Sequence, residues 1–150
     1  MTTREEMIAV LNSIVIPALR QRGFTGSFPH LRRIGANQID LMTFQFDKWG
    51  GGFIVEISKC STEGVTMPWG EKIPPKKVTA HDLNPRDRLR LGCEDPSAEH
   101  WYRYDSGNTL ESVAKEVVQQ IDKAEKWWAG SQQAEADARL AKILSARSLA

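Results

Sequence analysis

Two runs of alternating apolar and polar residues, 38–46 and 52–58, constrain the fold of this chain more than any other feature. A period of two is typical of a β-strand with one buried face. Residues 47–51 join the runs and end in two glycines, which suit the tight connection of a β-hairpin. Because helical patterns lie on both sides of this hairpin, we expect an α+β domain built on an antiparallel sheet.

A first helix is predicted near the N-terminus. Thr3 and Glu6 have the spacing of a capping box, in which each side chain satisfies the other residue's backbone N–H. Gly23 is expected to end this helix, and Pro17 to bend it, because proline removes a backbone donor. Between Thr3 and Gly23, apolar residues recur at helical spacing: Ile8, Leu11, Val15 and Leu19.

A second helix is predicted after Asn108, which repeats the same start signal with Glu111. Gly130 is expected to end it. Residues 132–147 are rich in alanine and charge and predict a third helix, whose thin apolar face offers a surface for a second copy of the chain. The apolar stripe of the second helix consists of Leu110, Val113, Val117, Ile121, Ala124 and Trp128.

Three further strands are expected, at residues 27–33, 86–91 and 100–104. With the hairpin they make a mostly antiparallel five-stranded sheet, in the element order α-β-β-β-β-β-α, followed by a C-terminal helical tail. We therefore divide the chain into a single α+β domain, residues 1–130, and a helical appendage, residues 131–150. Residues 59–86 hold too many glycines and prolines for a regular element, and such a loop either carries a binding site or covers a sheet edge.

The composition is that of one folded domain. The 150 residues are 41% hydrophobic and 26% charged, which excludes a wholly disordered chain. A net charge of +1 gives no general attraction to nucleic acid or to a membrane, so neither is an expected partner. No apolar run has the length of a signal-peptide core or a membrane span, so we expect a cytoplasmic protein. Its two cysteines, Cys60 and Cys93, are then expected to be reduced thiols, with one disulfide as the alternative.

Residues suited to catalysis or metal binding are present but lack the spacing that such sites need. Zinc sites usually take ligands in pairs two to four residues apart, and no such pair occurs among the zinc-compatible residues Cys60, His81, Cys93 and His100. His81 as a base with Cys60 or Cys93 as a nucleophile would form a catalytic site only if the side chains lay within hydrogen-bonding distance, and the sequence alone does not show this. Asp40, Asp47 and Glu56 lie on or beside the hairpin, where two nearby acids could divide acid and base roles. Asp40 and Glu56 point, by parity, to the same face as several apolar residues, so the alternative is that one or both pair with an arginine. We expect no metal and no cofactor.

A row of arginines is the most distinctive polar feature. Arg86, Arg88 and Arg90 alternate along one predicted strand and Arg103 lies on the next, so these side chains are expected to project from one sheet face. Such a row can bind phosphates or carboxylates, form ion pairs within the protein, or contact an acidic protein partner.

Several tryptophans lie where burial is hard to predict. Trp49 and Trp69 fall in turn or loop segments beside glycine or proline. Exposed aromatics in loops are typical anchors of protein contacts, and the alternative is that both fold back as lids on the core. Trp127 departs from the stripe that Trp128 continues, so we expect it to cover the tail helix or a neighbouring subunit.

Parts of this pattern resemble a bacterial family known as domain of unknown function 4304. The similar segments are residues 16–24 at the end of the first helix, the strands at 39–45 and 52–55, the strand at 88–91, the Trp101–Tyr102 step and the closing helix. The resemblance covers about residues 5–129. It implies a fold and supplies no functional residues, and some similar α+β families serve as immunity proteins that neutralise a toxin.

These observations favour a bacterial cytosolic protein-binding module that works by complementarity, in the manner of an immunity protein or antitoxin, rather than by catalysis. The candidate surface combines residues 59–86 with Trp49, Trp69, Arg86, Arg88, Arg90 and Arg103. The alternative is a small anionic-ligand or nucleotide-binding domain, with an enzyme as one form, in which the arginines bind the anion and Asp40 or His81 acts as a base.

Overall fold

The computed structural model describes residues 3–92 and 100–148, with side chains as far as Gly130. The chain begins with helix α1 (Arg4–Gln21) and ends with helix α2 (Leu110–Ser148). Two 3-10 helices, η1 (Ala80–Asp82) and η2 (Pro85–Asp87), lie in the second half. The strands are β1 (Thr25–Ser27), β2 (His30–Ile34), β3 (Ile39–Phe46), β4 (Gly52–Cys60), β5 (Val65–Thr66), β6 (Lys72–Ile73), β7 (Leu89–Arg90) and β8 (Tyr102–Arg103).

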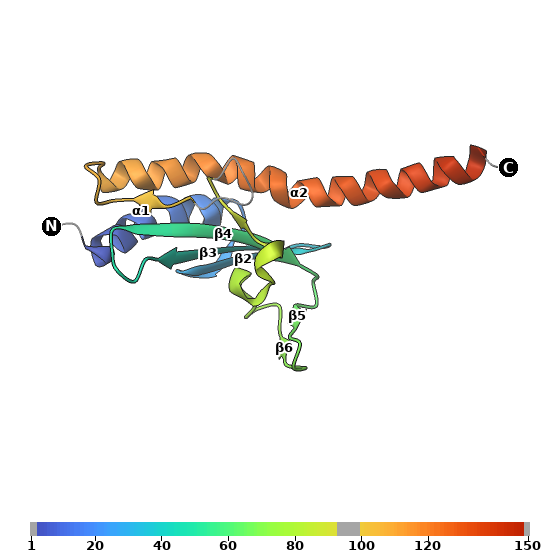
Figure 1. The fold of residues 1–150 in the computed structure, drawn as a ribbon, viewed down its shortest axis with the longest axis horizontal. Coiled ribbons are helices and arrows are strands. Elements are labelled where there is room, and N and C mark those ends of the chain that lie inside the picture. The colour runs from blue at the N-terminus through green and yellow to red at the C-terminus, as the bar shows by residue number, and fades with distance from the viewer. Residues whose placement is uncertain (1–2, 93–99, 149–150) are drawn as a thin grey trace.

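Six strands form the main sheet, in the order β1-β2-β3-β4-β7, with β8 also paired to β4. All of these pairings are antiparallel, and β5 and β6 make a separate hairpin. Both helices lie on one face of the sheet, and the β5–β6 hairpin hangs from the other side (Figure 1). The predicted α+β class with an antiparallel sheet is confirmed, although the sheet has six strands rather than five. We call the side away from α1 and α2 the helix-free face.

The hairpin predicted from the alternating runs is the centre of the sheet. β3 pairs with β4 along its whole length. The connection closes where the Asp47 N–H donates to the Gly52 carbonyl at 2.9 Å. Gly50 and Gly51 both adopt a positive φ, of 91° and 84°, which a residue without a Cβ tolerates. These glycines therefore serve the turn.

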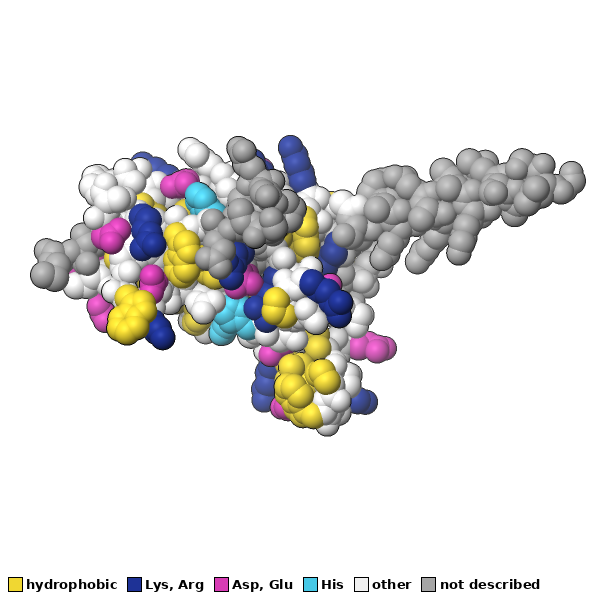
Figure 2. Space-filling model, viewed as in Figure 1, with side chains coloured by type: hydrophobic (Ala, Val, Ile, Leu, Met, Phe, Trp, Pro, Cys, Tyr) yellow, Lys and Arg dark blue, Asp and Glu magenta, His cyan; other side chains and the backbone are white. Residues whose placement is uncertain are grey.

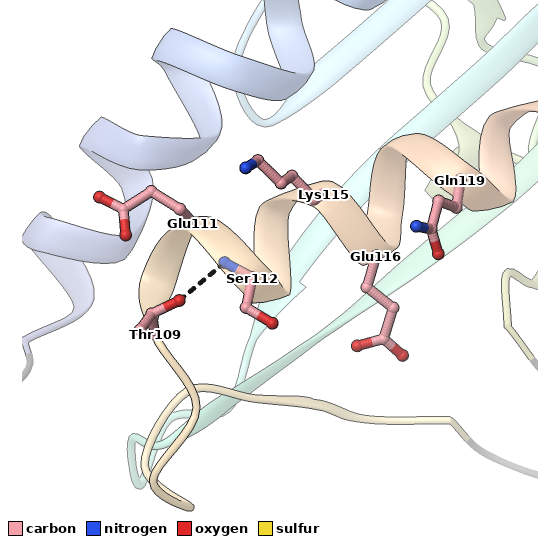
Figure 3. Close-up of a pocket in the computed structure, with 6 residues that line it drawn as sticks. All are labelled: Thr109, Glu111, Ser112, Lys115, Glu116 and Gln119. Carbon is pink, nitrogen blue, oxygen red and sulfur yellow. Dashed lines mark hydrogen bonds between the residues drawn. The ribbon is translucent and has the colours of Figure 1, made fainter.

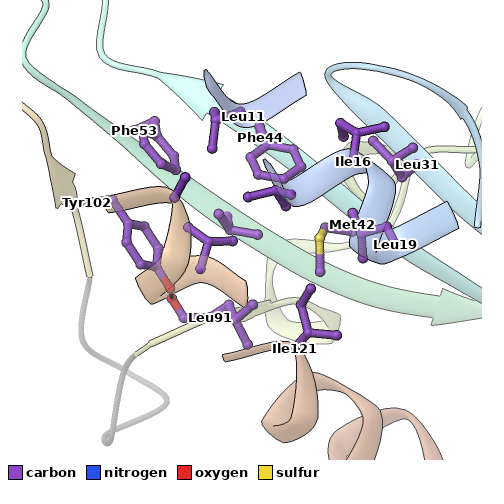
Figure 4. Close-up of a cluster of buried hydrophobic side chains, with 14 of the residues drawn as sticks. Leu11, Ile16, Leu19, Leu31, Met42, Phe44, Phe53, Leu91, Tyr102 and Ile121 are labelled. Atoms are coloured by element: carbon purple, nitrogen blue, oxygen red, sulfur yellow. Dashed lines mark hydrogen bonds between the residues drawn. The ribbon is translucent and has the colours of Figure 1, made fainter. Parts of the chain in front are cut away.

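The main core fills the layer between the sheet and the two helices. Alternate residues of β3 and β4 face the helices: Met42, Phe44, Phe53, Val55 and Ile57. Helix α1 contributes fully buried residues at helical spacing: Met7, Leu11, Val15 and Leu19. The stripe predicted for α2 is confirmed from Val113 to Trp128, and Figure 4 shows side chains of both helices and the sheet meeting in this layer.

A smaller core lies on the helix-free face. Val78 and Ala80 pack there against Ile39 and Leu41, and all four side chains are fully buried. The chain after β4 forms the β5–β6 hairpin and then returns across this face to η1. The long segment at 59–86 therefore covers part of a sheet face and not merely an edge.

Helix α1 begins where the sequence predicts. The Thr3 Oγ1 accepts a hydrogen bond from the Glu6 N–H at 3.1 Å. The helix continues through Pro17 and ends at Gln21. Gly23 follows with a φ of 92°, as expected of a glycine that terminates a helix.

Helix α2 differs from the prediction at both ends. Its cap is Thr109, whose Oγ1 accepts from the Ser112 N–H at 3.1 Å, so the predicted cap at Asn108 is wrong. The helix runs through Gly130 to Ser148, so the predicted stop and the separate third helix are also wrong. One glycine inside a helix costs only about 1 kcal/mol relative to alanine, which is too little to end a long helix.

The first predicted strand, residues 27–33, is divided between β1 and β2. Residues 28–29 form the turn of a hairpin in which Ser27 pairs with His30. Proline has no N–H to donate to a ladder, so a proline at position 29 interrupts the strand. The prediction missed this because the flanking residues are all compatible with extended structure.

The strand predicted at residues 86–91 is reduced to the two residues of β7. The Asn84 Oδ1 accepts from the Arg86 N–H at 3.2 Å and starts η2, in which a proline occupies the first turn. A capping residue followed by proline is a helix-start signal that outweighs the alternation after it. The strand predicted at 100–104 is likewise reduced to β8.

Candidate functional site

The predicted arginines lie along the β4 edge of the sheet, although not in one strand. Arg90 is paired with Glu56 between β7 and β4, and Arg103 with Gly52 between β8 and β4. Directly paired residues share a face, so both arginines are on the helix-free face. Arg86 is exposed in η2, outside the sheet. The structure therefore brings Arg90 and Arg103 to one face and places Arg86 apart from them.

Arg88 is held by the protein itself. Its Nε donates to the Leu83 carbonyl at 3.0 Å and its Nη2 to the His81 carbonyl at 2.8 Å. Its Nη1 lies 3.5 Å from the Glu56 Oε2, and only 17% of the side chain is exposed. Arg88 thus ties the segment of η1 and η2 to β4. A charge reversal here would break that tie and is expected to disturb the fold.

Glu56 and two histidines form a polar cluster on the helix-free face. Glu56 is 5% exposed, and its Oε1 lies 3.7 Å from the His81 Nε2, a distance that allows electrostatic attraction but not a hydrogen bond. The His30 Nδ1 lies 3.1 Å from the Oγ1 of buried Thr43. The two imidazole rings stand edge to face, 6.2 Å apart. The cluster links β2, β3, β4 and η1.

The Glu56 carboxylate is expected to stabilise the fold at neutral pH and to lose this effect in acid. His81 lowers the pKa of Glu56, burial raises it in part, and Arg88 and Arg90 lower it further, so the pKa lies below its usual 4.5. A lowered pKa in the folded state gives stability that is complete above the unfolded pKa and is lost as the pH falls through the folded value.

Glu56→Gln should therefore lower the free energy of unfolding by about 1 kcal/mol at pH 7, and the difference should shrink below pH 4.5. Urea unfolding of both proteins between pH 7 and pH 3 measures the effect. Glu63→Gln, at an exposed position, is the control and should change little. A Glu56→Gln difference that stays constant over this range would contradict the assignment.

Trp49 and Trp69 are exposed by 85% and 70%, so the alternative that they fold back as lids is wrong. Trp49 lies in the turn between β3 and β4, where its backbone N–H donates to the Asp47 Oδ1 at 2.9 Å. Trp69 lies at the tip of the β5–β6 hairpin, where its Nε1 donates to the Glu71 Oε2 at 3.0 Å. Figure 2 shows apolar side chains gathered over this hairpin. Both indoles are presented to solvent from hydrogen-bonded turns.

Two further tryptophans lie near the arginines. The guanidinium carbon of Arg103 is 5.6 Å from the centre of the Trp101 ring, a cation–π contact. Trp127 is half-buried, with the Lys59 Nζ 5.0 Å from its ring centre. It borders a hollow of about 320 Å³ together with Lys59, Leu83, Arg86 and Asp87. Trp127 thus packs over the end of β4 in its own domain.

Asp40 lies on the opposite sheet face from Glu56 and does not meet the arginine row. Its Oδ2 accepts from Arg33 at 2.7 Å (Nη2) and 3.0 Å (Nε), and Arg33 also binds the Glu125 carboxylate of α2. The alternative that the hairpin acids pair with arginines is confirmed, with Arg33 for Asp40 and Arg88 for Glu56. The two acids cannot share acid and base roles, because the sheet separates them.

The described residues do not support a thiol nucleophile. Burial raises the pKa of the Cys60 thiol to about 11, with smaller effects from Asp40 and Asp82, so the thiol is protonated at neutral pH. Among the side chains that the structure describes, no three of His, Cys, Asp or Glu come together as a metal site requires. Cys93, another of the zinc-compatible residues, lies outside the described residues.

A hollow of about 760 Å³ runs along the first turns of α2. Its lining residues are all polar: Thr109, Glu111, Ser112, Lys115, Glu116 and Gln119. Figure 3 shows them spreading outward from a single helix and its cap. Because the side chains diverge rather than converge, this hollow gives a ligand little to bind.

Two smaller hollows meet at the turn before β2, and both include Phe28, Pro29 and His30. The first, of about 560 Å³, is completed by Arg4, Ile8, Phe44, Gln45, Phe46 and His81. The second, of about 340 Å³, is completed by Gly26, Ser27, Arg32, Lys76, Lys77 and Thr79. This region was not among the sites predicted from the sequence. The lysine pair at 76–77 was a visible signal, but its meeting with β2 depends on contacts far apart in the chain.

The comparisons with known proteins identify the family. A family model described as Domain of unknown function (DUF4304) matches residues 15–131. The chain belongs to this family. The match confirms the resemblance found in the sequence, and it begins at residue 15 rather than near residue 5. The matched part of this DUF4304 protein includes the whole main sheet.

No curated protein and no solved structure matches this DUF4304 protein. In the described residues, neither α1 nor α2 has an apolar stretch long enough to cross a bilayer.

Proposed function

We propose that this DUF4304 protein is a protein-binding module that recognises an acidic surface on a partner protein by complementarity of shape and charge. The observation that carries the proposal is the exposure of Trp49 and Trp69, at 85% and 70%, on two separate turns. We use the name tryptophan–arginine surface for Trp49, Trp69, Arg90 and Arg103.

Tryptophan is the residue most enriched among the anchors of protein interfaces, because one side chain buries a large area with little loss of conformational freedom. The hydrogen bonds of Trp49 to Asp47 and of Trp69 to Glu71 order both turns before a partner arrives. This order reduces the entropy that binding would cost. Arginine is the second favoured anchor residue, and its charge selects an acidic partner.

Within this class we propose the antitoxin-like form, in which the partner is a toxin that the protein neutralises in the cytoplasm of a bacterium. Binding alone accounts for neutralisation, so the proposal requires no reactive centre. It predicts that the gene beside this one encodes the partner. Co-expression with this protein should then rescue growth of cells that the neighbouring gene product inhibits.

The binding proposal is tested by truncating the anchors. A tagged protein captures its partner from cells that encode it, the partner is identified and purified, and its Kd is measured for each variant. Trp49→Ala and Trp69→Ala should each raise the Kd about tenfold or more, because loss of an anchoring tryptophan typically costs about 2 kcal/mol. Arg103→Glu should weaken binding and flatten its dependence on salt.

Ile34→Ala is the matched control, because Ile34 is an exposed apolar residue, at 46%, outside the tryptophan–arginine surface. Its Kd should remain that of the parent protein. All four variants should keep the parent melting temperature, since the changed side chains are exposed. A partner that binds both tryptophan variants as tightly as the parent would overturn the proposal.

A further inference from the structure

The larger of the two hollows at the turn before β2 has an aromatic wall. The ring centres of Phe28 and Phe44 are 5.2 Å apart, and those of Phe28 and Phe46 are 6.1 Å apart. Phe28 and Phe46 are half-buried, so ring surface remains open to the hollow. The Arg4 guanidinium carbon lies 5.8 Å from the Phe46 ring centre, at the same hollow. A flat apolar ring fits such a wall by stacking.

The smaller hollow has a basic lining. Arg32, Lys76 and Lys77 border it, together with the Thr79 residue that precedes η1. Arg32 is fixed in place, because its Nε donates to the Val78 carbonyl at 3.0 Å. Three cations bordering one hollow favour a phosphate group.

Carboxylates do not oppose these cations within the two hollows. None of the described lining residues of either hollow is Asp or Glu. The nearby Asp82 is engaged by η1, where its Oδ2 accepts from the Thr79 N–H at 2.8 Å. The chain as a whole has nearly balanced charge, so a region with Arg4, Arg32 and two lysines but no acid in its lining is a local departure.

His30 forms part of both linings. Burial lowers the pKa of His30, His81 and Arg32 lower it further, and Asp82 acts in the opposite direction. The imidazole is therefore neutral at pH 7, and its Nδ1 is placed by Thr43. His30 therefore places an uncharged ring between the aromatic wall and the basic lining.

We infer that the two hollows form one small-molecule site, which binds a flat ring against Phe28 and Phe46 and a phosphate group beside Arg32, Lys76 and Lys77. The ligand class is a phosphate monoester that also carries a flat aromatic ring, such as a nucleoside monophosphate. The volumes, about 560 and 340 Å³, are within the range of ligand pockets. The site shares no residue with the tryptophan–arginine surface.

The inference is tested by titrating the full chain with AMP, with adenosine, which lacks the phosphate, and with inorganic phosphate, which lacks the ring. Calorimetry gives the affinities, and ¹⁵N NMR locates the shifts. AMP should bind about tenfold more tightly than adenosine or inorganic phosphate. Its shifts should include residues 28–32, 44–46 and 76–79 together.

Lys76→Ala/Lys77→Ala should weaken AMP binding about tenfold or more, because two phosphate contacts are lost. Lys48→Ala/Lys72→Ala removes the same charge from exposed positions outside both linings and should change the affinity less than about twofold. Gln45→Trp fills the aromatic hollow from an exposed position, so it should weaken AMP binding to about the affinity of inorganic phosphate and leave inorganic phosphate binding intact.

Three outcomes would overturn the inference. The first is the absence of AMP-induced shifts at millimolar concentration. The second is equal affinity for AMP and inorganic phosphate, which would mean that no ring site exists. The third is equal weakening of AMP binding by both lysine pairs, which would mean general charge attraction without a site.

Discussion

Replacement of Trp128 by alanine is expected to lower the free energy of unfolding by about 4 kcal/mol. The indole is 1% exposed, and its ring centre lies 5.3 Å from that of Phe24. Its Nε1 donates to the Ser58 carbonyl at 2.9 Å, so truncation removes apolar contact and also leaves a buried acceptor without this donor. The melting temperature, followed by circular dichroism, should fall by about 10 °C.

Trp127→Ala is the matched control, since it removes the same side chain from the adjacent position. Trp127 is only half-buried and its charged neighbour is Lys59, so the expected loss is about 1 kcal/mol. Equal losses in the two variants would contradict the placement of α2.

A chain that ends after Gly130 keeps both tryptophans and should melt within a few degrees of the full chain. A melting temperature this close to that of the full chain would support the division into residues 1–130 and 131–150.

Arg33→Met is expected to cost about 3 kcal/mol, the second largest effect. The guanidinium joins Asp40 in the sheet to Glu125 in α2, with Nη2 distances of 2.7 and 2.6 Å, and it also lies 4.7 Å from the centre of the Phe24 ring. The Asp40 side chain is only 10% exposed. Loss of Arg33 therefore leaves a largely buried carboxylate without its cation. Urea unfolding measures the change.

Two controls separate this effect from a simple loss of surface charge. Arg22→Met breaks the pair of Arg22 with Asp122, which is 74% exposed, and should cost less than about 1 kcal/mol. Adding Asp40→Asn to Arg33→Met removes the uncompensated charge and should recover part of the lost stability. If the double variant is no more stable than Arg33→Met alone, the buried charge is not the cause.

Regular periodicity made most of the fold predictable. The alternation at residues 38–58 gave the central hairpin, and the helical stripe from Val113 to Trp128 gave the first part of α2. Both patterns depend only on neighbours along the chain. The errors arose where one residue competed with a pattern: Pro29 divided a strand, and Gly130 did not end a helix.

The contacts that define the candidate sites were much less predictable. Arg33 meets Glu125 across 92 positions of sequence, and Arg32 meets Val78 across 46. No local signal links residues so far apart. Exposure of Trp49 and Trp69 was one of two alternatives in the sequence, because a turn residue either folds back or stands out according to the surface beneath it. The self-pairing of Arg88 was likewise visible only in three dimensions.

Because its tryptophans differ in burial, the intrinsic fluorescence of this protein should distinguish binding from unfolding. Trp128, shielded beside Phe24, should fluoresce at shorter wavelength than Trp49 and Trp69, whose excited states relax in water. Of the five tryptophans, iodide should quench Trp49 and Trp69 most and Trp128 least. A partner that covers the turns would then suppress quenching, whereas denaturation would increase it. Association and denaturation would thus change one unlabelled signal in opposite directions.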